Sequence, residues 1–431
     1  MRETKQLWAL SPLFVFLGLY VLISLIIGDF YKIPLTVALL IATLWALWIY
    51  RGVPFSERIE AFVKEAGNSN VLYMVWIFIL AGCFATLADK TGAVEATVAL
   101  TINKLPADFV MPGLFMASCF ISMAIGTSVG TVVALIPLAV NYASTSGGDI
   151  PFFVAIVLGG SFFGDNLSFI SDTTIAATRT QGCNMKDKFK ANFFLVLPAA
   201  IITLAIYFFG GFSIPEYTYE MQYNPWLIIP YLAVIILAIC GVNVTLTLVT
   251  GIILSCVLAL FEGFGIFDIF SFMGAGIDGM GNLIIITLLA AGMLGLIKAA
   301  GGIDILLRIL SKNIKGTRGA QATIALLVSI VNLCTANNTV AILTVGSISK
   351  DISEKYNIPS RRAASILDTA SCITQCLIPY GAQTLLATSL AGISPTSPWK
   401  YLFYPWILAA TVILSLIFWK YIFKPKNKFA I

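Results

Sequence analysis

Long apolar runs separated by short polar loops make up most of this chain. A membrane-spanning helix needs about 20 apolar residues, and runs of roughly this length recur from one end of the chain to the other. We predict embedded segments at Trp8–Gly28, Ile33–Tyr50, Val71–Ala88, Phe109–Ala143, Phe152–Thr178, Phe193–Gly210, Trp226–Cys240, Val244–Phe261, Leu283–Ala299, Ala320–Ser347, Ala363–Thr388 and Tyr401–Trp419. The pattern indicates an all-α polytopic membrane protein with about ten spanning helices.

Two of the long segments, 109–143 and 320–347, are interrupted by short polar sequences. The interruptions read GTSVGT (Gly126–Thr131) and TANNT (Thr335–Thr339). We predict that each segment is a re-entrant hairpin whose tip lies inside the membrane. The tips offer hydroxyls, amides and exposed backbone as substrate or ion contacts, or as polar groups that hold helices together. The candidate residues are Thr127, Ser128, Thr131, Asn337, Asn338 and Thr339.

A third polar run, GGSFFGDNLSFISDTTIAATRTQ (Gly159–Gln181), lies in the apolar segment 152–178. Carboxylates at membrane depth are costly and face protein or water, where they mark ion or proton pathways. Dense polar sequence also predicts a helix break, because freed backbone groups are tolerated where protein or water surrounds them. We therefore predict a discontinuous helix at 152–178 and its counterpart at 363–388.

The two halves of the chain resemble each other. TSVGTVVAL (Thr127–Leu135) matches ANNTVAIL (Ala336–Leu343), and Ser161–Thr178 aligns without gaps with Ser371–Thr388. We predict a first repeat at 1–211, an extracytoplasmic linker at 212–225 and a second repeat at 226–431.

Loop charges indicate that one repeat is inverted relative to the other. Arg51–Asn70 carries three Lys or Arg residues and its partner Glu262–Gly281 carries none. Lys350–Arg362 carries four and its partner Ser144–Ile150 carries none. Because basic loops stay on the cytoplasmic side, this pattern predicts two inverted-topology repeats with both termini in the cytoplasm.

Composition argues against several classes of function. The chain is 59% hydrophobic and 11% charged, with a net charge of +5, and its basic residues orient a membrane protein, not a nucleic-acid-binding one. It has no histidine and no P-loop or HExxH sequence, so an enzyme, a cofactor site and a nucleotide-driven pump are disfavoured. If the protein moves protons, the carrier is a carboxylate or a chain of water.

The first break carries the richest set of oxygen ligands. Asp165 and Asp172 are about two helical turns apart, and a break between them lets both approach one point. Hard cations such as Na⁺ prefer such ligands, and the candidate set is Asp165, Asn166, Ser168, Asp172, Thr173 and Thr174. We predict Asp165 and Asp172 as the proton carriers; the alternative is that Ser171 or Asp172 caps the second half-helix.

The second break is chemically different from the first. Gln375 and Ala382 stand where the first half has Asp165 and Asp172. We therefore expect neutral support from the second repeat, at Thr374, Gln375 and Gln383. We expect Asp368, near a helix start, to lie at the cytoplasmic edge.

The first break resembles the signature of the NhaC family of Na⁺/H⁺ antiporters, G-D-x-x-S-x-x-S-D-T-T. The matching residues are Gly164, Asp165, Ser168, Ser171, Asp172, Thr173 and Thr174. The resemblance implies inverted repeats that each hold a hairpin and a discontinuous helix, exchange of Na⁺ for H⁺, and a place in the plasma membrane of a prokaryote. Asn166, directly after the Gly-Asp pair, departs from the commoner members and bears on selectivity.

Our hypothesis is that Na⁺ and protons compete for these carboxylates during secondary active transport. The resemblance leaves an alternative open, because the family also contains malate/lactate exchangers and proposed amino-acid transporters. The sequence shows no obvious Arg in mid-membrane, which disfavours a dicarboxylate. A channel is the remaining rival, and a homodimer is compatible with the sequence.

Overall fold

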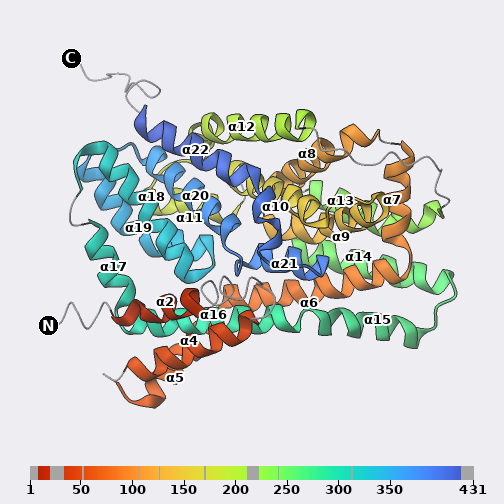
Figure 1. The fold of residues 1–431 in the computed structure, drawn as a ribbon, viewed down its shortest axis with the longest axis horizontal. Coiled ribbons are helices and arrows are strands. Elements are labelled where there is room, and N and C mark those ends of the chain that lie inside the picture. The colour runs from red at the N-terminus through yellow and green to blue at the C-terminus, as the bar shows by residue number, and fades with distance from the viewer. Residues whose placement is uncertain are drawn as a thin grey trace.

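The computed structural model is helical through most of the residues that it describes (Figure 1). It describes residues 8–19, 34–50, 53–104, 106–125, 127–168, 171–210, 223–240, 242–311 and 314–418, and no strand occurs in these ranges. The first half contains η1 (Trp8–Leu10), α2 (Ser11–Leu17), α4 (Leu35–Ile49), α5 (Phe55–Ala66), α6 (Ser69–Lys90), α7 (Ala93–Lys104), α8 (Ala107–Ile125), α9 (Ser128–Ser146), α10 (Ile150–Leu167), α11 (Asp172–Gln181) and α12 (Met185–Phe209).

The second half follows a matching order. It contains η3 (Pro225–Ile228), α13 (Ile229–Ile239), α14 (Val244–Phe261), α15 (Ile266–Gly279), α16 (Gly281–Ala299), α17 (Gly302–Ser311), α18 (Gly316–Thr335), α19 (Asn338–Lys355), α20 (Ser360–Leu377), α21 (Ala382–Ala391), η4 (Ser397–Tyr401) and α22 (Phe403–Ile417). In each half a pair of helices joined at a short tip (α8–α9, α18–α19) is followed by a helix in two pieces (α10–α11, α20–α21).

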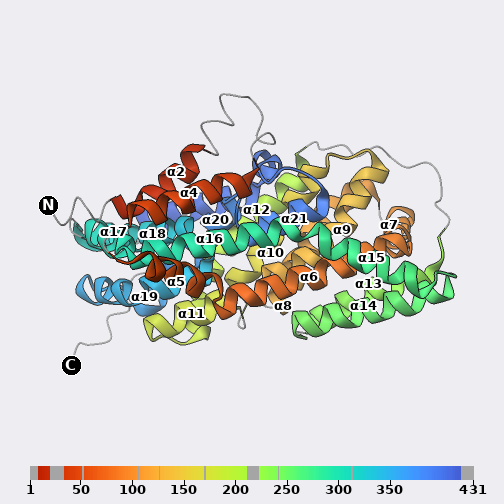
Figure 2. The ribbon, with the colours of Figure 1, turned by 90° about the horizontal axis from the view of Figure 1, so that it is seen from below.

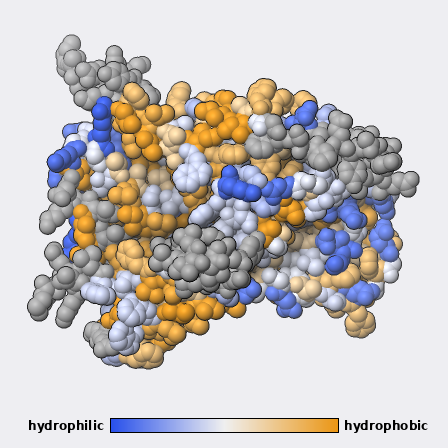
Figure 3. Space-filling view, viewed as in Figure 1, coloured by the Kyte–Doolittle hydropathy of each residue, from blue (hydrophilic) through white to orange (hydrophobic). Residues whose placement is uncertain are grey.

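The outer surface suits a lipid environment. Within the described residues, seven helical stretches are long and apolar enough to cross a membrane. Large apolar side chains point outward, including Phe209, Phe261 and Phe267 at 81%, 82% and 87% exposure, and apolar surface covers wide areas of the face in Figure 3. Such extensive apolar exposure marks a membrane surface, not a water-facing one. The protein is a multi-pass helical membrane protein.

Two segments that the sequence analysis treated as loops contain helices. Arg51–Asn70 holds α5, and Glu262–Gly281 holds α15. A glycine of the second segment allows close packing between two helices. A Cβ on Gly276 of α15 would collide with the backbone of Gly82 on α6, because small residues let two helix backbones approach closely.

Both helix pairs bend at extended backbone. Thr127 precedes α9 with φ −149° and ψ 129°, and Asn337 precedes α19 with φ −146° and ψ 111°. Ala336, just before Asn337, has a left-handed φ of 49°. Residues in these conformations cannot continue a helix. In each helix pair the chain therefore turns at the polar sequence between the two helices.

The discontinuous helices are broken in the same way. Ser168 and Ser171 flank the first break with ψ near 143°, and Ile378 and Gly381 flank the second with ψ of 120° and 144°. Extended backbone here frees carbonyl and amide groups that an uninterrupted helix would bond internally. These groups become available to side chains and ions.

The halves interlock by reciprocal packing. Helix α15 packs along α6 while α16 packs along α5, and α11 packs on α19 while α21 packs on α9. In Figures 1 and 2 the pair α18–α19 lies toward the left and α9 toward the right, with α10 between them. Each broken helix thus ends against the tip-bearing helix of the other half.

Several sequence predictions fall outside the described residues. They are the end of the first segment (20–28), most of the linker (212–222, with Glu216 and Glu220), tip residue Gly126, and the C-terminal Lys420, Lys424, Lys426 and Lys428.

Candidate functional site

A cavity of about 590 Å³ lies where the two tips meet the first break. We call it the central cavity. It is lined by Tyr73, Met74, Ile77, Thr127, Ser128, Val129, Asp165, Asp172, Thr173, Ile175, Ala176, Arg179, Asn243, Val244, Asn337, Asn338, Thr339, Leu343 and Gln383. The structure therefore brings both predicted carboxylates, most tip residues and one residue of the second break to one space.

Asp165 forms the inner wall of this cavity. It lies in the last turn of α10 and is only 4% exposed. Its carboxylate accepts hydrogen bonds from the Ser128 amide (3.0 Å) and the Ser128 hydroxyl (2.6 Å) at the start of α9. A carboxylate at a helix N-terminus meets unsatisfied amides and the positive end of the helix dipole. Asp165 thus joins the first break to the first tip.

The freed backbone of the break is held by hydroxyls. The Asp165 carbonyl accepts from the hydroxyls of Ser171 (2.8 Å) and Thr173 (3.3 Å). Ser171 also caps α11 by accepting from the Thr174 amide at 3.2 Å. Of the two capping candidates, Ser171 is therefore the cap, and Asp172 is left free of that role.

Asp172 begins α11 and faces the central cavity with an exposed side chain. Its carboxylate makes no hydrogen bond to any part of the chain that the structure describes. Arg179, about two turns further along α11, lines the same cavity. The two carboxylates of the signature therefore face one space, one buried and one open to solvent.

Neutral side chains continue the network into the second half. Gln383 donates to the Ser128 hydroxyl (3.0 Å) and accepts from the Gln375 amide (2.9 Å). Gln375 also donates to the Ala336 carbonyl at the second tip (2.9 Å). A continuous chain of hydrogen bonds thus runs from Asp165 through both tips. Thr374 does not join it, because its hydroxyl donates back to Ala370 of its own helix.

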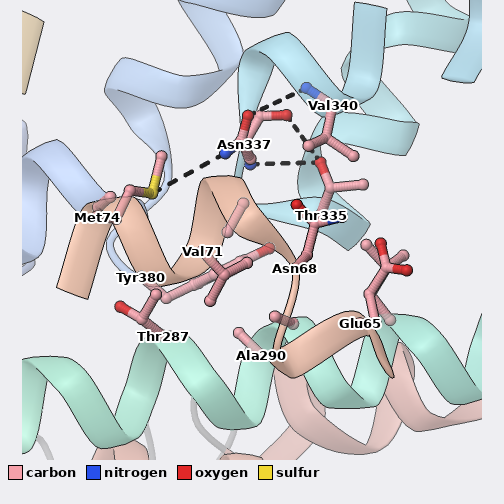
Figure 4. A pocket seen from close by; sticks show the side chains of 14 residues that line it. Glu65, Asn68, Val71, Met74, Thr287, Ala290, Thr335, Asn337, Val340 and Tyr380 are labelled. Carbon is pink, nitrogen blue, oxygen red and sulfur yellow. Dashed lines mark hydrogen bonds between the residues drawn. The ribbon is translucent and has the colours of Figure 1, made fainter. Parts of the chain in front are cut away.

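Contacts of the Asn337 and Asn338 side chains hold the second tip in place. The Asn337 side chain caps α19 by accepting from the Val340 amide (3.0 Å), and its amide contacts the Met74 sulfur (3.9 Å). Figure 4 shows this tip against α6 and α16, beside a small cavity of about 40 Å³. Asn338 contacts the Cys372 sulfur at 3.9 Å.

Six predicted residues do not line the central cavity: Thr131, Asn166, Ser168, Thr174, Thr374 and Gln375. The Ser168 hydroxyl donates to the Met123 carbonyl, and the Thr131 hydroxyl donates to the Thr127 carbonyl. Asn166 and Thr174 contact Lys188 instead, because the Asn166 carbonyl and the Thr174 hydroxyl accept from its ammonium at 2.9 Å and 2.6 Å.

Behind the break lies a buried ion pair that the sequence analysis missed. Lys188 of α12 and Asp368 of α20 are 2.7 Å apart, with side chains 1% and 0% exposed. Asp368, which we expected at the cytoplasmic edge, is fully buried in the protein where α10, α12 and α20 pack together.

One sequence signal could have placed Lys188 on an internal helix face, although it does not reveal Asp368. Lys188 falls in the basic run Lys186–Lys190, which has the composition of a loop, yet it lies four residues before Asn192. That spacing puts both on one helix face, and Asn192 donates to Asp368 at 2.7 Å.

A second buried cation, Arg362, also changes the count of Lys and Arg residues in the loops. Arg362 is 1% exposed and donates to the side chains of Gln321 (3.0 Å) and Ser415 (2.7 Å). One of the four cations counted in Lys350–Arg362 is therefore internal. Arg179 at the central cavity also weakens the sequence argument that the membrane region lacks an arginine.

Comparison with known proteins gives relatives along nearly the whole chain. The malate-2H⁺/Na⁺-lactate antiporter of Bacillus subtilis is 22% identical over 98% of this chain and 97% of its own length. The Na⁺/H⁺ antiporter NhaC of the same organism is 25% identical over 84% of this chain and 86% of its own. The arginine/ornithine antiporter ArcD of Halobacterium salinarum is 24% identical over 78% and 77%.

A family profile matches both halves. The profile described as the Na⁺/H⁺ antiporter family covers residues 7–212 and 216–420, which includes both tips and both breaks. This confirms the resemblance drawn from the Gly164–Thr174 signature. The chain belongs to the Na⁺/H⁺ antiporter family, whose members are secondary transporters and not enzymes.

Proposed function

We propose that this protein exchanges Na⁺ for H⁺ at Asp165, with Asp172 as the entry carboxylate. The observation that carries the proposal is the position of Asp165. It is a nearly buried carboxylate at the wall of the central cavity, between a helix break and a polar tip. Ionisable groups at membrane depth mark ion and proton pathways.

The surrounding oxygens suit a small hard cation. The Asp165 carboxylate, the Ser128 hydroxyl and the Thr173 hydroxyl lie at the cavity wall. Asp172 and the tip residue Thr127 supply further oxygens to the same space. In the proposed cycle, Na⁺ from the cytoplasm displaces a proton from Asp165, and on the other side a proton displaces Na⁺.

Inverted repeats supply the movement in this proposal. The matching helix order and the reciprocal packing of α11 on α19 and α21 on α9 support two repeats related by a pseudo-twofold axis. In such transporters one unit moves against another around a site near the midplane. We propose that α8–α9 and α18–α19 are re-entrant hairpins, and that the broken helices move with them.

The proposed orientation of the protein in the membrane follows from the Lys and Arg residues in its loops. Arg179, Lys186 and Lys190 cluster after the first break, and Lys350, Lys355 and Arg361 lie around the end of α19. By the positive-inside rule, this end of the molecule faces the cytoplasm, with both termini on that side of a prokaryotic plasma membrane. Because Arg179 lines the central cavity, the cavity opens toward the cytoplasm.

The test is ²²Na⁺ uptake into proteoliposomes driven by an imposed pH gradient. Wild-type protein takes up Na⁺ only while the gradient lasts, and the double variant Asp165→Asn with Asp172→Asn does not. Asp351→Asn, an exposed carboxylate on α19, is the matched control and retains uptake. Full pH-driven uptake by the double variant would show that these carboxylates are not the exchange site.

A second candidate function is Na⁺-coupled exchange of a small organic ion. The central cavity, at about 590 Å³, is much larger than Na⁺ requires, since pockets of roughly 300–1,000 Å³ hold small molecules. Arg179 and the amides of Asn243 and Asn338 line it. These groups suit a carboxylate, and the malate/lactate and arginine/ornithine relatives show that such cargo occurs among similar chains.

Counterflow separates the two candidates. Vesicles preloaded with malate, lactate or arginine are tested for uptake of the labelled compound in the presence of Na⁺. Uptake that is abolished in Arg179→Gln would establish the organic cargo. Na⁺/H⁺ exchange with no counterflow of any of the three supports the first function.

A further inference from the structure

A second cavity, of about 420 Å³, lies away from the central cavity. Its walls come mainly from α6, α7, α9, α15 and α21, which lie toward the right in Figures 1 and 2, whereas α11 and α19 lie toward the left. We call it the Asp89 cavity, because Asp89 is the one charged side chain among the described residues that line it. It shares no lining residue with the central cavity.

Three helices line both cavities. Helices α6, α9 and α21 each do so at positions six to eight residues apart: Ile77 and Ala85, Val129 and Pro137, and Gln383 and Ser389. At the rise of an α-helix, this leaves a barrier of about 9–12 Å between the two cavities. Leu80 of α6, Val133 of α9 and Leu386 of α21 lie within the barrier and are buried. The two cavities are therefore placed as the ends of one route that a short apolar barrier closes.

The Asp89 cavity offers hydroxyls that the protein does not use. Thr86, Ser144 and Ser389 line it, and their hydroxyls make no hydrogen bond to any part of the chain that the structure describes. Hydroxyls within helices often bond back to the preceding turn, as those of Thr131 and Ser146 do on α9. The three unused hydroxyls are therefore available to water or to an ion.

Asp89 and Asn141 add a carboxylate and an amide oxygen to this space. The Asp89 side chain is 57% exposed, and its partner Lys90, at 3.9 Å, is 55% exposed and does not line the cavity. A pair so exposed is weak, so the charge of Asp89 remains available to a cation. Asn141 Oδ1 accepts from the Thr145 hydroxyl at 3.3 Å and keeps room for a further partner. Carboxylate, amide and hydroxyl oxygens are the ligands that hard cations prefer.

The repeat gives this cavity a side of the membrane. Ser389 stands in α21 where Arg179 stands in α11, in the gapless alignment that pairs Asp165 with Gln375. The far end of each broken helix therefore lies at a cavity, α11 at the central cavity and α21 at the Asp89 cavity. In inverted repeats these ends face opposite sides. With the Arg179 end toward the cytoplasm, as proposed above, the Asp89 cavity opens to the outside.

We propose that the Asp89 cavity is an outer cation-binding vestibule, in which Asp89 and Asn141 hold a Na⁺ ion between the outside water and the barrier. A cleft lined by one sign of charge concentrates counter-ions, so Asp89 raises the Na⁺ concentration in front of the barrier. This inference rests on the proposed exchange at Asp165 and adds a separate site on the outer side. Because the barrier separates the two cavities, Asp89 acts on the outer face alone.

The experiment measures the half-saturating Na⁺ concentration at each face, from dye-monitored proton flux in right-side-out and inside-out membrane vesicles. Asp89→Asn raises the outer value by about two- to five-fold, as expected for an exposed charge, and leaves the cytoplasmic value unchanged. The shift shrinks at high ionic strength, because salt screens exposed charges. Asn141→Asp adds a second carboxylate to the cavity and lowers the outer value by a similar factor.

Asp108→Asn is the matched control. Asp108 is an exposed carboxylate in the first turn of α8, at the end of that helix away from the first tip, and it does not line the Asp89 cavity. Both half-saturating values stay at the wild-type level in this variant. A shift as large as that of Asp89→Asn would show a general effect of surface charge and would overturn the vestibule.

The outcomes separate the two proposals. Unchanged outer values in Asp89→Asn and Asn141→Asp overturn the vestibule and leave exchange at Asp165 standing. Equal shifts at the two faces, or a shift at the cytoplasmic face alone, also overturn it. No Na⁺-dependent proton flux in wild-type vesicles contradicts the exchange itself. If Asp89→Asn does not reach the membrane, Asn141→Asp carries the test, because a folding defect does not raise the affinity for Na⁺.

Discussion

Asp165 and Gln375 hold matching places, each in the last turn of the helix before a break. Asp165 accepts from the Ser128 amide at the first tip, and Gln375 donates to the Ala336 carbonyl at the second. The backbone at the two breaks is nearly the same. The architecture therefore tolerates either a charged or a neutral residue at this place, and the charge is what makes the first break the candidate ion site.

The first break is also more tightly packed. A Cβ on Gly164 would collide with Ser122 of α8, whereas the matching Thr374 is partly exposed and bonded within its own helix. Close packing around the charged break limits the room available to Asp165. The neutral break has no such contact at the matching position, Thr374.

The largest effect is expected from Asp165→Asn compared with Gln375→Ala. Hydrogen bonds to a charged group contribute about 1.5–3 kcal/mol, so losing the charge at Asp165 should weaken Na⁺ exchange by roughly 10- to 150-fold. Gln375→Ala should slow exchange by less. Dye-monitored proton flux on adding Na⁺ measures both, and equal losses in the two variants would remove the distinction between the breaks.

The difference in packing predicts a difference in stability. Overpacking a close contact costs about 1–3 kcal/mol, so Gly164→Ala should lower the melting temperature of the detergent-solubilised protein. Thr374→Ala is the matched control and should leave it nearly unchanged. A melting temperature equal to wild type in Gly164→Ala would mean that the α8–α10 contact can relax.

Asp172→Asn should have a smaller effect than Asp165→Asn. Because Asp172 is exposed to the cavity, its interaction with an arriving cation is screened, and about 1 kcal/mol or less is expected. The apparent affinity for Na⁺ should fall several-fold at low ionic strength and less at high salt. Uptake measured against Na⁺ concentration at two salt levels tests this; loss of all transport would give Asp172 the central role instead.

Gln383→Ala is expected to have the smallest effect. It removes one neutral hydrogen bond to Ser128, worth about 1 kcal/mol, and so disconnects the two halves of the network. The transport rate should fall a few-fold with little change in Na⁺ affinity. A large loss of affinity would place Gln383 among the ion ligands.

The sequence predicts much of this arrangement from polar residues in apolar runs. The tips at Thr127 and Asn337 and the break after Asp165 were predicted from the positions of polar residues within apolar runs. Polar sequence in such a run needs protein or water around it. Ser171 was one of two capping candidates, and the structure chose between them.

What the sequence did not reveal depends on long-range packing. Lys188 looks like a loop cation, and only the approach of α12 to α20 shows that it meets Asp368. The segment that holds helix α15 was treated as a loop, whereas its Gly276 fits against Gly82 on a distant helix. Neither partner can be found from the local sequence.

The most direct test of the central claim is equilibrium ²²Na⁺ binding to purified protein as a function of pH. Wild-type protein should bind Na⁺ more weakly as the pH falls, because protons and Na⁺ compete for Asp165. Asp165→Asn should lose most of this binding and its pH dependence, while Asp351→Asn keeps both. Wild-type Na⁺ affinity and pH dependence in Asp165→Asn would contradict the account.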